Sequence, residues 1–315
     1  SFLKKKIKKN FIFINNIDEN KLIKIKKNNF YNTLFIIISK SGKTLETLSN
    51  FEALKIIKKK AKNIIIISEK SNNPLYLISK KFQLHHIEHK NYIGGRYSVL
   101  SEVGMLPAQL MGLSESKFKQ LNNLAKNKKF ISNLIKNVEC TLNFLKKGKF
   151  TSIILNYDES SENIFKWYQQ LIAESLGKKS KGLLPIVSSM PKDNHSLMQF
   201  YLDGPMKSFY TFFYVRDRLS VKIKSDKILS KANYLKGKDI KNIIYSQKIA
   251  TENVFKKRKI PFRSFEVINK NEECLGELFT FFILETILLG RALNVNPFDQ
   301  PSVELIKKET KKILA

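Results

Sequence analysis

The chain has 315 residues, which is enough for two domains with a sizeable core, and its hydrophobic fraction of 43% indicates a packed globular protein. Its net charge of +30 comes from 57 Lys and Arg against 27 Asp and Glu, scattered along the whole chain instead of gathered in one block. This scatter argues against a nucleic-acid-binding protein, although a basic surface would speed the capture of an anionic substrate.

Apolar, β-branched runs alternate with helical patterns along most of the chain. This order predicts an α/β fold with mainly parallel sheets and crossover helices. The predicted strands are 34–38, 63–67, 82–87, 152–155, 183–187, 209–215 and 261–266. The predicted helices are 44–59, 97–111, 115–126, 131–145, 163–175, 195–201, 238–257, 273–292 and 302–314. A Lys-Lys-Gly-Lys break at 146–149 predicts a boundary between two α/β units, residues 1–146 and 147–315, and the segment before residue 32 is assigned to no element.

A cluster of hydroxyl residues follows the first predicted strand, and a helical pattern begins directly after it. The cluster places Ser39, Ser41, Thr44 and Thr47 around Gly42. The unpaired N–H groups of a helix's first turn attract an anion, and hydroxyls add neutral donors to a phosphate. Because the spacing of the nucleotide P-loop is absent, we predict a phosphomonoester site. The alternative is that the threonines only cap the helix.

A Gly94-Gly95-Arg96 sequence follows the third predicted strand and opens an apolar helical pattern. Glycines allow the backbone to approach a ligand closely, and Arg96 could face an anion or a developing oxyanion. The alternative is a tight turn that carries a surface arginine.

Gln170 and Glu174 are four residues apart on a strongly amphipathic predicted helix, so they share one face. A carboxylate among so many apolar neighbours is a candidate general base. The alternative is an ordinary solvated helix glutamate.

The remaining candidates are histidines and a lysine. His195 lies after a loop, at a predicted helix start, where functional histidines are commonly exposed, and it is the candidate acid partner. Lys307 is one of several basic residues on the last predicted helix. The histidines at 85, 86 and 89 lack the metal-binding H-E-x-x-H pattern and fall on a predicted strand, so no metal site is expected.

Three further classes of protein are disfavoured. Cys140 and Cys274 lie far apart in apolar surroundings, so we expect buried free thiols in a reducing cytoplasm and no disulfide framework. The most apolar late stretch, 278–290, is too short to span a membrane and contains Glu285. The N-terminal residues show neither a signal peptide nor an initiating Met, so a fragment is expected.

Five segments, in this order, resemble the phosphoglucose isomerase family. They are SKSGKTLET, GGRYS, WYQQLIAESLGK, DNHSLMQFYLDGP and NPFDQPSVELIKK, and they extend from about Phe35 to Lys307. The resemblance implies two sugar-isomerase subdomains, each a three-layer αβα unit. It also implies an aldose–ketose isomerase of glycolysis and gluconeogenesis, which interconverts glucose 6-phosphate and fructose 6-phosphate through an enediol intermediate without a metal or cofactor.

The same resemblance implies a role for each candidate. The base that moves a proton between C1 and C2 is Glu174, and the arginine that stabilises the enediolate is Arg96. Residues that help open the sugar ring are His195 and Lys307. His195 is expected to reach the neighbouring subunit's site, which implies a homodimer. The substrate-binding matches are Ser39, Ser41, Thr44 and Thr47 in the phosphate loop, and Gln170 and Gln300 in the pocket lining.

Two departures from the family pattern leave alternatives open. The family has a G-I-G-G-S segment upstream of the phosphate loop that this chain lacks, which indicates an N-terminally truncated fragment. The S-x-S-G-x-T pattern of residues 39–44 is also similar to non-catalytic regulators with the same domain. Such a regulator would bind a sugar phosphate without turnover. Specificity for mannose 6-phosphate also stays open.

Overall fold

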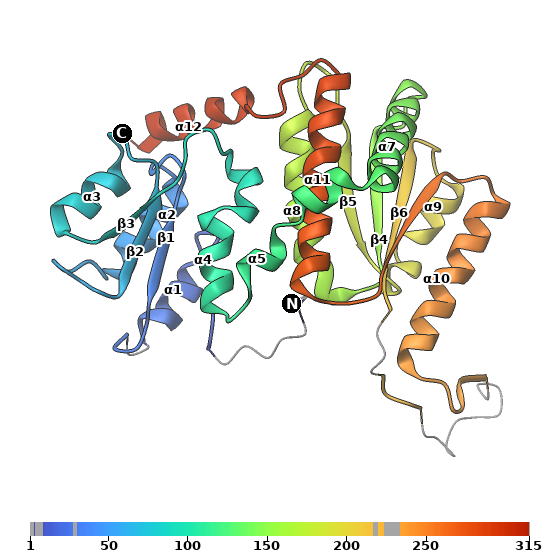
Figure 1. Ribbon diagram of the computed structural model, residues 1–315, viewed down its shortest axis with the longest axis horizontal. Helices are drawn as coiled ribbons and strands as arrows, with labels where there is room; N and C mark the ends of the chain where they lie inside the picture. The colour runs from blue at the N-terminus through green and yellow to red at the C-terminus, as the bar shows by residue number, and fades with distance from the viewer. Residues whose placement is uncertain (1–2, 4–8, 28–29, 217–219, 224–233, 315) are drawn as a thin grey trace. The chain divides into compact units, whose positions relative to one another are not determined.

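The computed structural model describes residues 3, 9–27, 30–216, 220–223 and 234–314. The chain forms two compact units, 6–115 and 116–315, the latter together with residues 1–5. Each unit is an α/β structure in which every paired strand among the described residues is parallel to its neighbours (Figure 1). The predicted fold class is therefore confirmed. The subdomain limits 1–146 and 147–315 stay a prediction, and the compact units place residues 116–146 with the later strands.

The first unit contains a three-stranded parallel sheet in the order β1-β2-β3. In register, Ile36 of the first strand is opposite Ile65, which is opposite His85. Its elements are α1 (Glu19–Lys26), β1 (Phe35–Ile38), α2 (Leu45–Leu54), β2 (Ile64–Ser68), α3 (Pro74–Phe82), β3 (His85–Glu88), the 3₁₀ helix η1 (Gly95–Leu100) and α4 (Glu102–Leu110).

Strand isoleucines and helix side chains form the core of this unit. Ile37 and Ile66 pack with Phe51 of α2 and Leu75 of α3, all of them buried. Such β-branched runs favour strands that lie between helices. Helix α2 ends five residues earlier than predicted, because Lys55 takes the left-handed conformation at φ 51°.

Two helices of this unit were missed from the sequence. Helix α1 lies in the segment that the sequence left unassigned, with Asp18 as its N-cap. Helix α3 begins at Pro74, after the cap Asn73, whose side chain accepts a hydrogen bond from the N–H of Tyr76 at 3.0 Å. An N-cap followed by proline is a helix-start signal that could have been used.

The second unit contains a four-stranded sheet in the order β5-β4-β6-β7. All seven predicted strands of the chain are found, with ends that differ by at most three residues. The elements of this unit are α5 (Glu115–Phe118), α6 (Leu121–Lys126), α7 (Lys128–Lys146), β4 (Thr151–Asn156), η2 (Glu159–Ser161), α8 (Glu162–Leu176), β5 (Leu184–Ser189), η3 (Lys192–Asn194), α9 (Met198–Asp203), β6 (Ser208–Val215), α10 (Ile240–Lys257), β7 (Phe262–Val267), α11 (Glu272–Ala292) and α12 (Pro301–Leu314).

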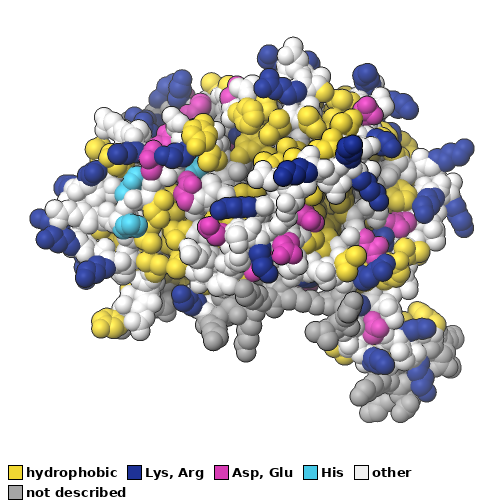
Figure 2. Space-filling view, in the orientation of Figure 1, with side chains coloured by type: hydrophobic (Ala, Val, Ile, Leu, Met, Phe, Trp, Pro, Cys, Tyr) yellow, Lys and Arg dark blue, Asp and Glu magenta, His cyan; other side chains and the backbone are white. Residues whose placement is uncertain are grey.

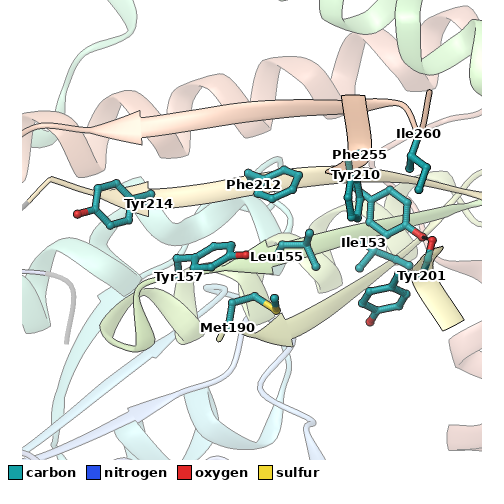
Figure 3. Close-up of a cluster of buried hydrophobic side chains, with 10 residues drawn as sticks. All are labelled: Ile153, Leu155, Tyr157, Met190, Tyr201, Tyr210, Phe212, Tyr214, Phe255 and Ile260. Carbon is teal, nitrogen blue, oxygen red and sulfur yellow. Dashed lines mark hydrogen bonds between the residues drawn. The ribbon is translucent and has the colours of Figure 1, made fainter. Parts of the chain in front are cut away.

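Helices cover both faces of this sheet, which makes three layers. On one face, Leu155 and Phe212 are paired in register and lie in a buried cluster with Phe255 of α10 (Figure 3). On the other face, the ring of Phe213 lies 4.7 Å from that of Phe165 on α8. Alternate residues of β6 therefore serve opposite faces, as strand geometry requires.

The structure corrects the prediction that both cysteines are buried. Both cysteines are free, but Cys140 is exposed on α7, so its predicted burial is wrong. Burial, with a contribution from Glu277, raises the pKa of Cys274 to about 11.

Lys and Arg side chains are dispersed over the visible face instead of gathered in one stripe (Figure 2). None of the helices in the described part of the chain has the length and apolar character that a membrane span requires.

Candidate active site

The candidate groups of the first unit follow the carboxyl ends of its parallel strands. Ser39 follows β1, Glu69 follows β2 and His89 follows β3. Because the strands are parallel, these ends meet at one edge of the sheet. Ligands of open α/β sheets bind at this edge.

The predicted phosphate turn is a closed loop between β1 and α2. The hydroxyls of Ser39 and Thr44 are hydrogen-bonded at 2.7 Å. Thr44 is the N-cap of α2, yet its side chain makes no capping hydrogen bond. The side chain of Thr44 thus leaves the N–H groups of the first helical turn uncapped. This arrangement disfavours the reading of Thr44 as a simple cap and suits the binding of an anion.

Gly42 is required where it lies in this turn. Its φ of 62° is a left-handed conformation that side chains rarely adopt. A Cβ built at Gly42 would lie 1.7 Å from Oδ1 of Asn73. Asn73 is itself buried and donates a hydrogen bond from Nδ2 to the carbonyl of Glu69 at 2.8 Å. The start of α3 therefore supports the phosphate turn.

Arg96 lies on η1 and is only 3% exposed. Its guanidinium lies over the ring of Tyr97, 5.4 Å from the centroid. The hydroxyl of Ser98 donates to the carbonyl of Gly95 at 2.7 Å and so fixes the turn around the arginine. The alternative of a surface arginine is wrong for this chain.

Gln170 and Glu174 are brought together near the C-terminal end of α8. Nε2 of Gln170 donates to Oε2 of Glu174 at 3.1 Å, and Glu174 is half-buried. The opposite side of the helix is fixed in the core, because Tyr168 and Leu171 are buried. Glu174 is therefore a carboxylate on a rigid element, partly shielded from water, and the reading of a fully solvated glutamate is disfavoured.

His195 lies in the loop between η3 and α9, where its side chain is exposed. The predicted helix start at His195 is wrong, because η3 ends at Asn194 and α9 begins only at Met198. Asp193 holds this loop, since its carboxylate accepts from the N–H of Ser189 at 2.8 Å and from the hydroxyl of Ser196 at 3.0 Å.

A lysine that the sequence analysis did not single out connects α8 to the loop before α12. Nζ of Lys178 donates to the carbonyl of Asn296 and, at 2.6 and 2.7 Å, to the carbonyl and carboxylate of Asp299. Gln300 follows directly in the chain and is half-buried. The position of Lys178 in the segment WYQQLIAESLGK, just after Glu174, was the signal that could have found it.

Lys307 lies on α12 with its ammonium 2.6 Å from Oε1 of Glu304, and 57% of its side chain is exposed. Its role in ring opening stays a prediction.

The histidine cluster is divided among different contacts. His86 hydrogen-bonds to Ser68 at 3.0 Å, and its pKa is lowered, chiefly by burial. His89 pairs with Glu102. Within the described ranges, no group of His, Cys, Asp and Glu could hold a metal ion.

An apolar cavity of about 870 Å³ lies elsewhere in the first unit. It is lined by residues 9–14 and by β1, and Thr47 is the one predicted site residue of this unit in its lining. The cavity is therefore separate from the turn formed by Ser39 and Thr44.

The comparisons with known proteins show the family to which this chain belongs. The family model described as phosphoglucose isomerase matches residues 2–186, which include the phosphate turn, Arg96 and Glu174. A probable glucose-6-phosphate isomerase from Methanococcus maripaludis is 34% identical over 88% of this chain. This chain belongs to the phosphoglucose isomerase family. It spans 64% of the length of that archaeal relative.

Solved structures show the same fold. A hypothetical protein from Thermus thermophilus has a TM-score of 0.86 and 25% identity, over 97% of this chain and 77% of its own. A glucose-6-phosphate isomerase from Chlamydia trachomatis has a TM-score of 0.70 at 18% identity, over 94% of this chain and 62% of its own. The second likeness shows that the fold of the phosphoglucose isomerase family extends over most of this chain.

Proposed function

We propose that this protein is an aldose–ketose isomerase that interconverts glucose 6-phosphate and fructose 6-phosphate. The observation that carries the proposal is the family match over residues 2–186, because it contains the phosphate turn, the buried arginine and the half-buried glutamate in one stretch. The match to the archaeal relative covers 88% of this chain and so extends this support beyond residue 186.

Substrate binding is assigned to neutral donors. The phosphate is bound by the first-turn N–H groups of α2 and by the hydroxyls of Ser39, Ser41, Thr44 and Thr47. An anchor at this remote phosphate holds the reacting carbons in place, which reduces the entropic part of the barrier. Gln170 and Gln300 are assigned to the sugar.

Proton transfer is assigned to Glu174. Its carboxylate removes the C2 proton of the open-chain aldose, and the electron pair moves to form an enediolate with negative charge on O1. Arg96 stabilises that oxygen. The protonated Glu174 returns the proton to C1 while the hydroxyl proton passes from O2 to O1, which leaves the carbonyl at C2 and gives the ketose. Two protons move within the substrate and no net oxidation occurs, so the chemistry needs neither a metal nor a redox cofactor.

Ring opening is assigned to His195 and Lys307, which move a proton between the ring oxygen and the anomeric hydroxyl. The proposal includes a cytoplasmic homodimer in which His195 serves the partner's site. The exposed position of this histidine, on a loop held by Asp193, supports that part of the proposal.

The test is proton exchange followed by NMR in deuterated water with glucose 6-phosphate. We expect fructose 6-phosphate to form with deuterium at C1, and glucose 6-phosphate re-formed by the reverse reaction to carry deuterium at C2. We expect Glu174→Gln to reduce turnover by a factor of about 10³ or more, as for loss of an essential base. The matched control is Glu162→Gln, at the opposite end of the same helix, where the carboxylate pairs with Lys166 at 2.7 Å.

Three outcomes would contradict the proposal. Turnover that survives Glu174→Gln would remove the assigned base. Equal losses in both variants would indicate damage to α8 instead of lost chemistry. Binding of the sugar phosphate without any turnover would favour a regulator.

A further inference from the structure

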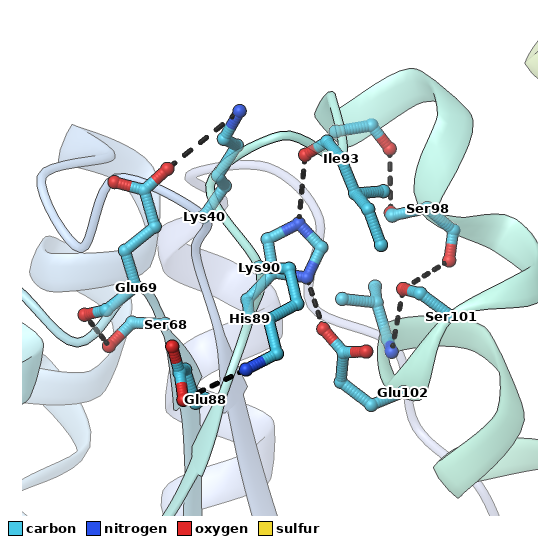
Figure 4. A network of polar contacts seen from close by, with 12 residues as sticks. Lys40, Ser68, Glu69, Glu88, His89, Lys90, Ile93, Ser98, Ser101 and Glu102 are labelled. Atoms are coloured by element: carbon cyan, nitrogen blue, oxygen red, sulfur yellow. Dashed lines mark hydrogen bonds and ion pairs between the residues drawn. The ribbon is translucent and has the colours of Figure 1, made fainter.

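The segment that connects β3 to η1 carries the backbone toward Arg96, and one buried histidine lies at its start. His89 is 1% exposed and directly follows the last residue of β3. Its ring lies between the backbone of Ile93 and the carboxylate of Glu102, the first residue of α4 (Figure 4). The resemblance to the family assigned no role to His89 or Glu102.

Both partners of the imidazole are acceptors. Nδ1 of His89 hydrogen-bonds to Oε1 of Glu102, and Nε2 lies 3.1 Å from the carbonyl oxygen of Ile93. An N–H on Nε2 satisfies the contact with Ile93, and one proton between Nδ1 and Oε1 satisfies the contact with Glu102, so the ring is held on both sides. A charge-assisted pair of this kind is stronger than a neutral hydrogen bond.

A lysine holds the same segment from the side of the phosphate turn. Nζ of Lys40 donates to the carbonyl of Asn91 at 2.8 Å and lies 3.7 Å from Oε1 of Glu69. Lys40 is the residue after Ser39, so the segment that leads to Arg96 is connected directly to the phosphate turn.

The arginine turn is the 3₁₀ helix η1, Gly95–Leu100, and its C-terminal end is also closely packed. A Cβ at Gly104 of α4 would lie 2.0 Å from the carbonyl oxygen of Val99, so η1 and α4 fit together only with glycine there. The hydroxyl of Ser101 donates to the carbonyl of Ser98 at 2.8 Å. Glu102 therefore belongs to the element against which the arginine turn packs.

We propose that His89, held between the carboxylate of Glu102 and the carbonyl of Ile93, is a positioning residue that fixes the 93–96 backbone and so places Arg96 for stabilisation of the enediolate. The inference rests on the proposed function for its catalytic consequence. It adds a residue that touches neither substrate nor the reacting atoms. A misplacement of about 1 Å at a catalytic group can reduce a rate about 10²-fold, so a brace on this turn has a measurable effect.

The test compares His89→Phe, which removes both contacts, with Glu102→Gln, which keeps an acceptor for Nδ1–H. Glu102→Leu removes that acceptor at a side chain that is already 25% exposed, so it is available if His89→Phe does not fold. The control is Lys90→Ala, next to His89, where the lysine forms an exposed ion pair with Glu88. Thermal unfolding identifies the variants that remain folded.

The first readout is amide hydrogen exchange of residues 93–100, which needs no turnover. We expect faster exchange in His89→Phe and Glu102→Leu, and no change in Lys90→Ala or in the core strand β2. Unchanged exchange in the folded variants would contradict the proposal that His89 and Glu102 hold this backbone.

The second readout is kinetic. We expect His89→Phe to lower kcat by a factor of about 10 to 10² with KM changed less than about twofold, and Glu102→Gln to retain most of kcat. In an Arg96→Lys background, His89→Phe should cause little further loss, because both changes act on one interaction. Losses of kcat that multiply in the double variant would overturn the positioning role. A rise in KM with kcat unchanged would also overturn it.

The two proposals fail in different ways. A wild-type chain that shows no isomerisation overturns the proposed function and the catalytic consequence of the brace, while the exchange data still report whether the brace exists. Isomerisation that is unaffected by His89→Phe overturns the further inference and leaves the proposed function standing.

Discussion

The two units place their candidate groups by different physical means. In unit 6–115 the edge strands β1 and β3 are short and only partly buried, and the phosphate and arginine turns are held by polar contacts such as Lys40 to Asn91. In unit 116–315 every residue of β6 is buried, and Glu174 lies on a helix packed by aromatic rings. The comparison indicates that precise turns depend on hydrogen bonds between side chains and backbone, whereas a rigid helix depends on its core.

Two lysine ion pairs, one from each unit, differ in the same direction. The pair of Lys40 with Glu69 in the first unit leaves a quarter to a third of each side chain exposed, at 34% and 24%. In the second unit, the pair of Lys270 with Asp158 has both side chains 7% exposed. Loss of a buried partner is costly, while exposed pairs contribute little. Substitutions should therefore affect stability most strongly in unit 116–315.

The largest expected effect is at the buried network around Glu285. Its carboxylate, 1% exposed, pairs with Arg263 and accepts from the hydroxyl of Tyr168 at 3.1 Å. Burial opposes the charge on Arg263, yet Glu285 and Tyr168 raise the pKa of its guanidinium above the ordinary value. Glu285→Ala should lower the free energy of unfolding by about 3–5 kcal/mol, measured by urea denaturation.

The control for this change is Glu309→Ala, which removes an exposed pair with Lys312 on α12 and should cost under about 1 kcal/mol. Equal costs for the two substitutions would remove the contrast between buried and exposed pairs.

The next effect concerns the phosphate turn. Gly42→Ala adds a side chain at φ 62° and forces Oδ1 of Asn73 to move, so we expect about 2–4 kcal/mol of destabilisation and a loss of phosphate binding. Gly112→Ala is the matched control, because Gly112 also has positive φ, 76°, but nothing lies within 4 Å of its Cβ. Denaturation and phosphate titration should show the smaller cost, about 1–2 kcal/mol, and intact binding for the control. Equal behaviour would show that Asn73 does not support the turn.

The smallest expected effect is a change in how the free energy of unfolding depends on pH in acid. Burial opposes ionisation of Asp158, but hydrogen bonds from Lys270, Ser161 and Ser160 lower the pKa of its carboxyl below the usual value. Because the pKa is lower in the folded state, the stabilisation is complete above the unfolded pKa of about 3.9 and is lost as the pH falls through the folded pKa. Asp158→Asn should make the unfolding free energy less dependent on pH below about 4. Parallel pH profiles for the variant and the wild type would contradict this assignment.

Much of the fold follows from local sequence patterns. Runs such as 35–38 and 64–67 contain only apolar residues and precede turn residues, so strand and helix order could be predicted without tertiary information. The end of α2 could not, because Lys55 takes a left-handed conformation that no composition rule requires. The exposure of Cys140 depends on which face of α7 packs inward, and apolar neighbours in sequence do not report that.

The candidate site divides in the same way. The sequence by itself determined the residue types and their order: hydroxyls after β1, glycines before Arg96, and Gln170 four residues from Glu174. Only the tertiary structure decided that Arg96 is buried, that Asn73 supports Gly42, and that His89 and Lys178 hold the neighbouring loops. These contacts join residues that are distant in sequence, such as Lys178 and Asp299, and their formation depends on packing and on paired hydrogen-bond partners, which local propensity does not specify.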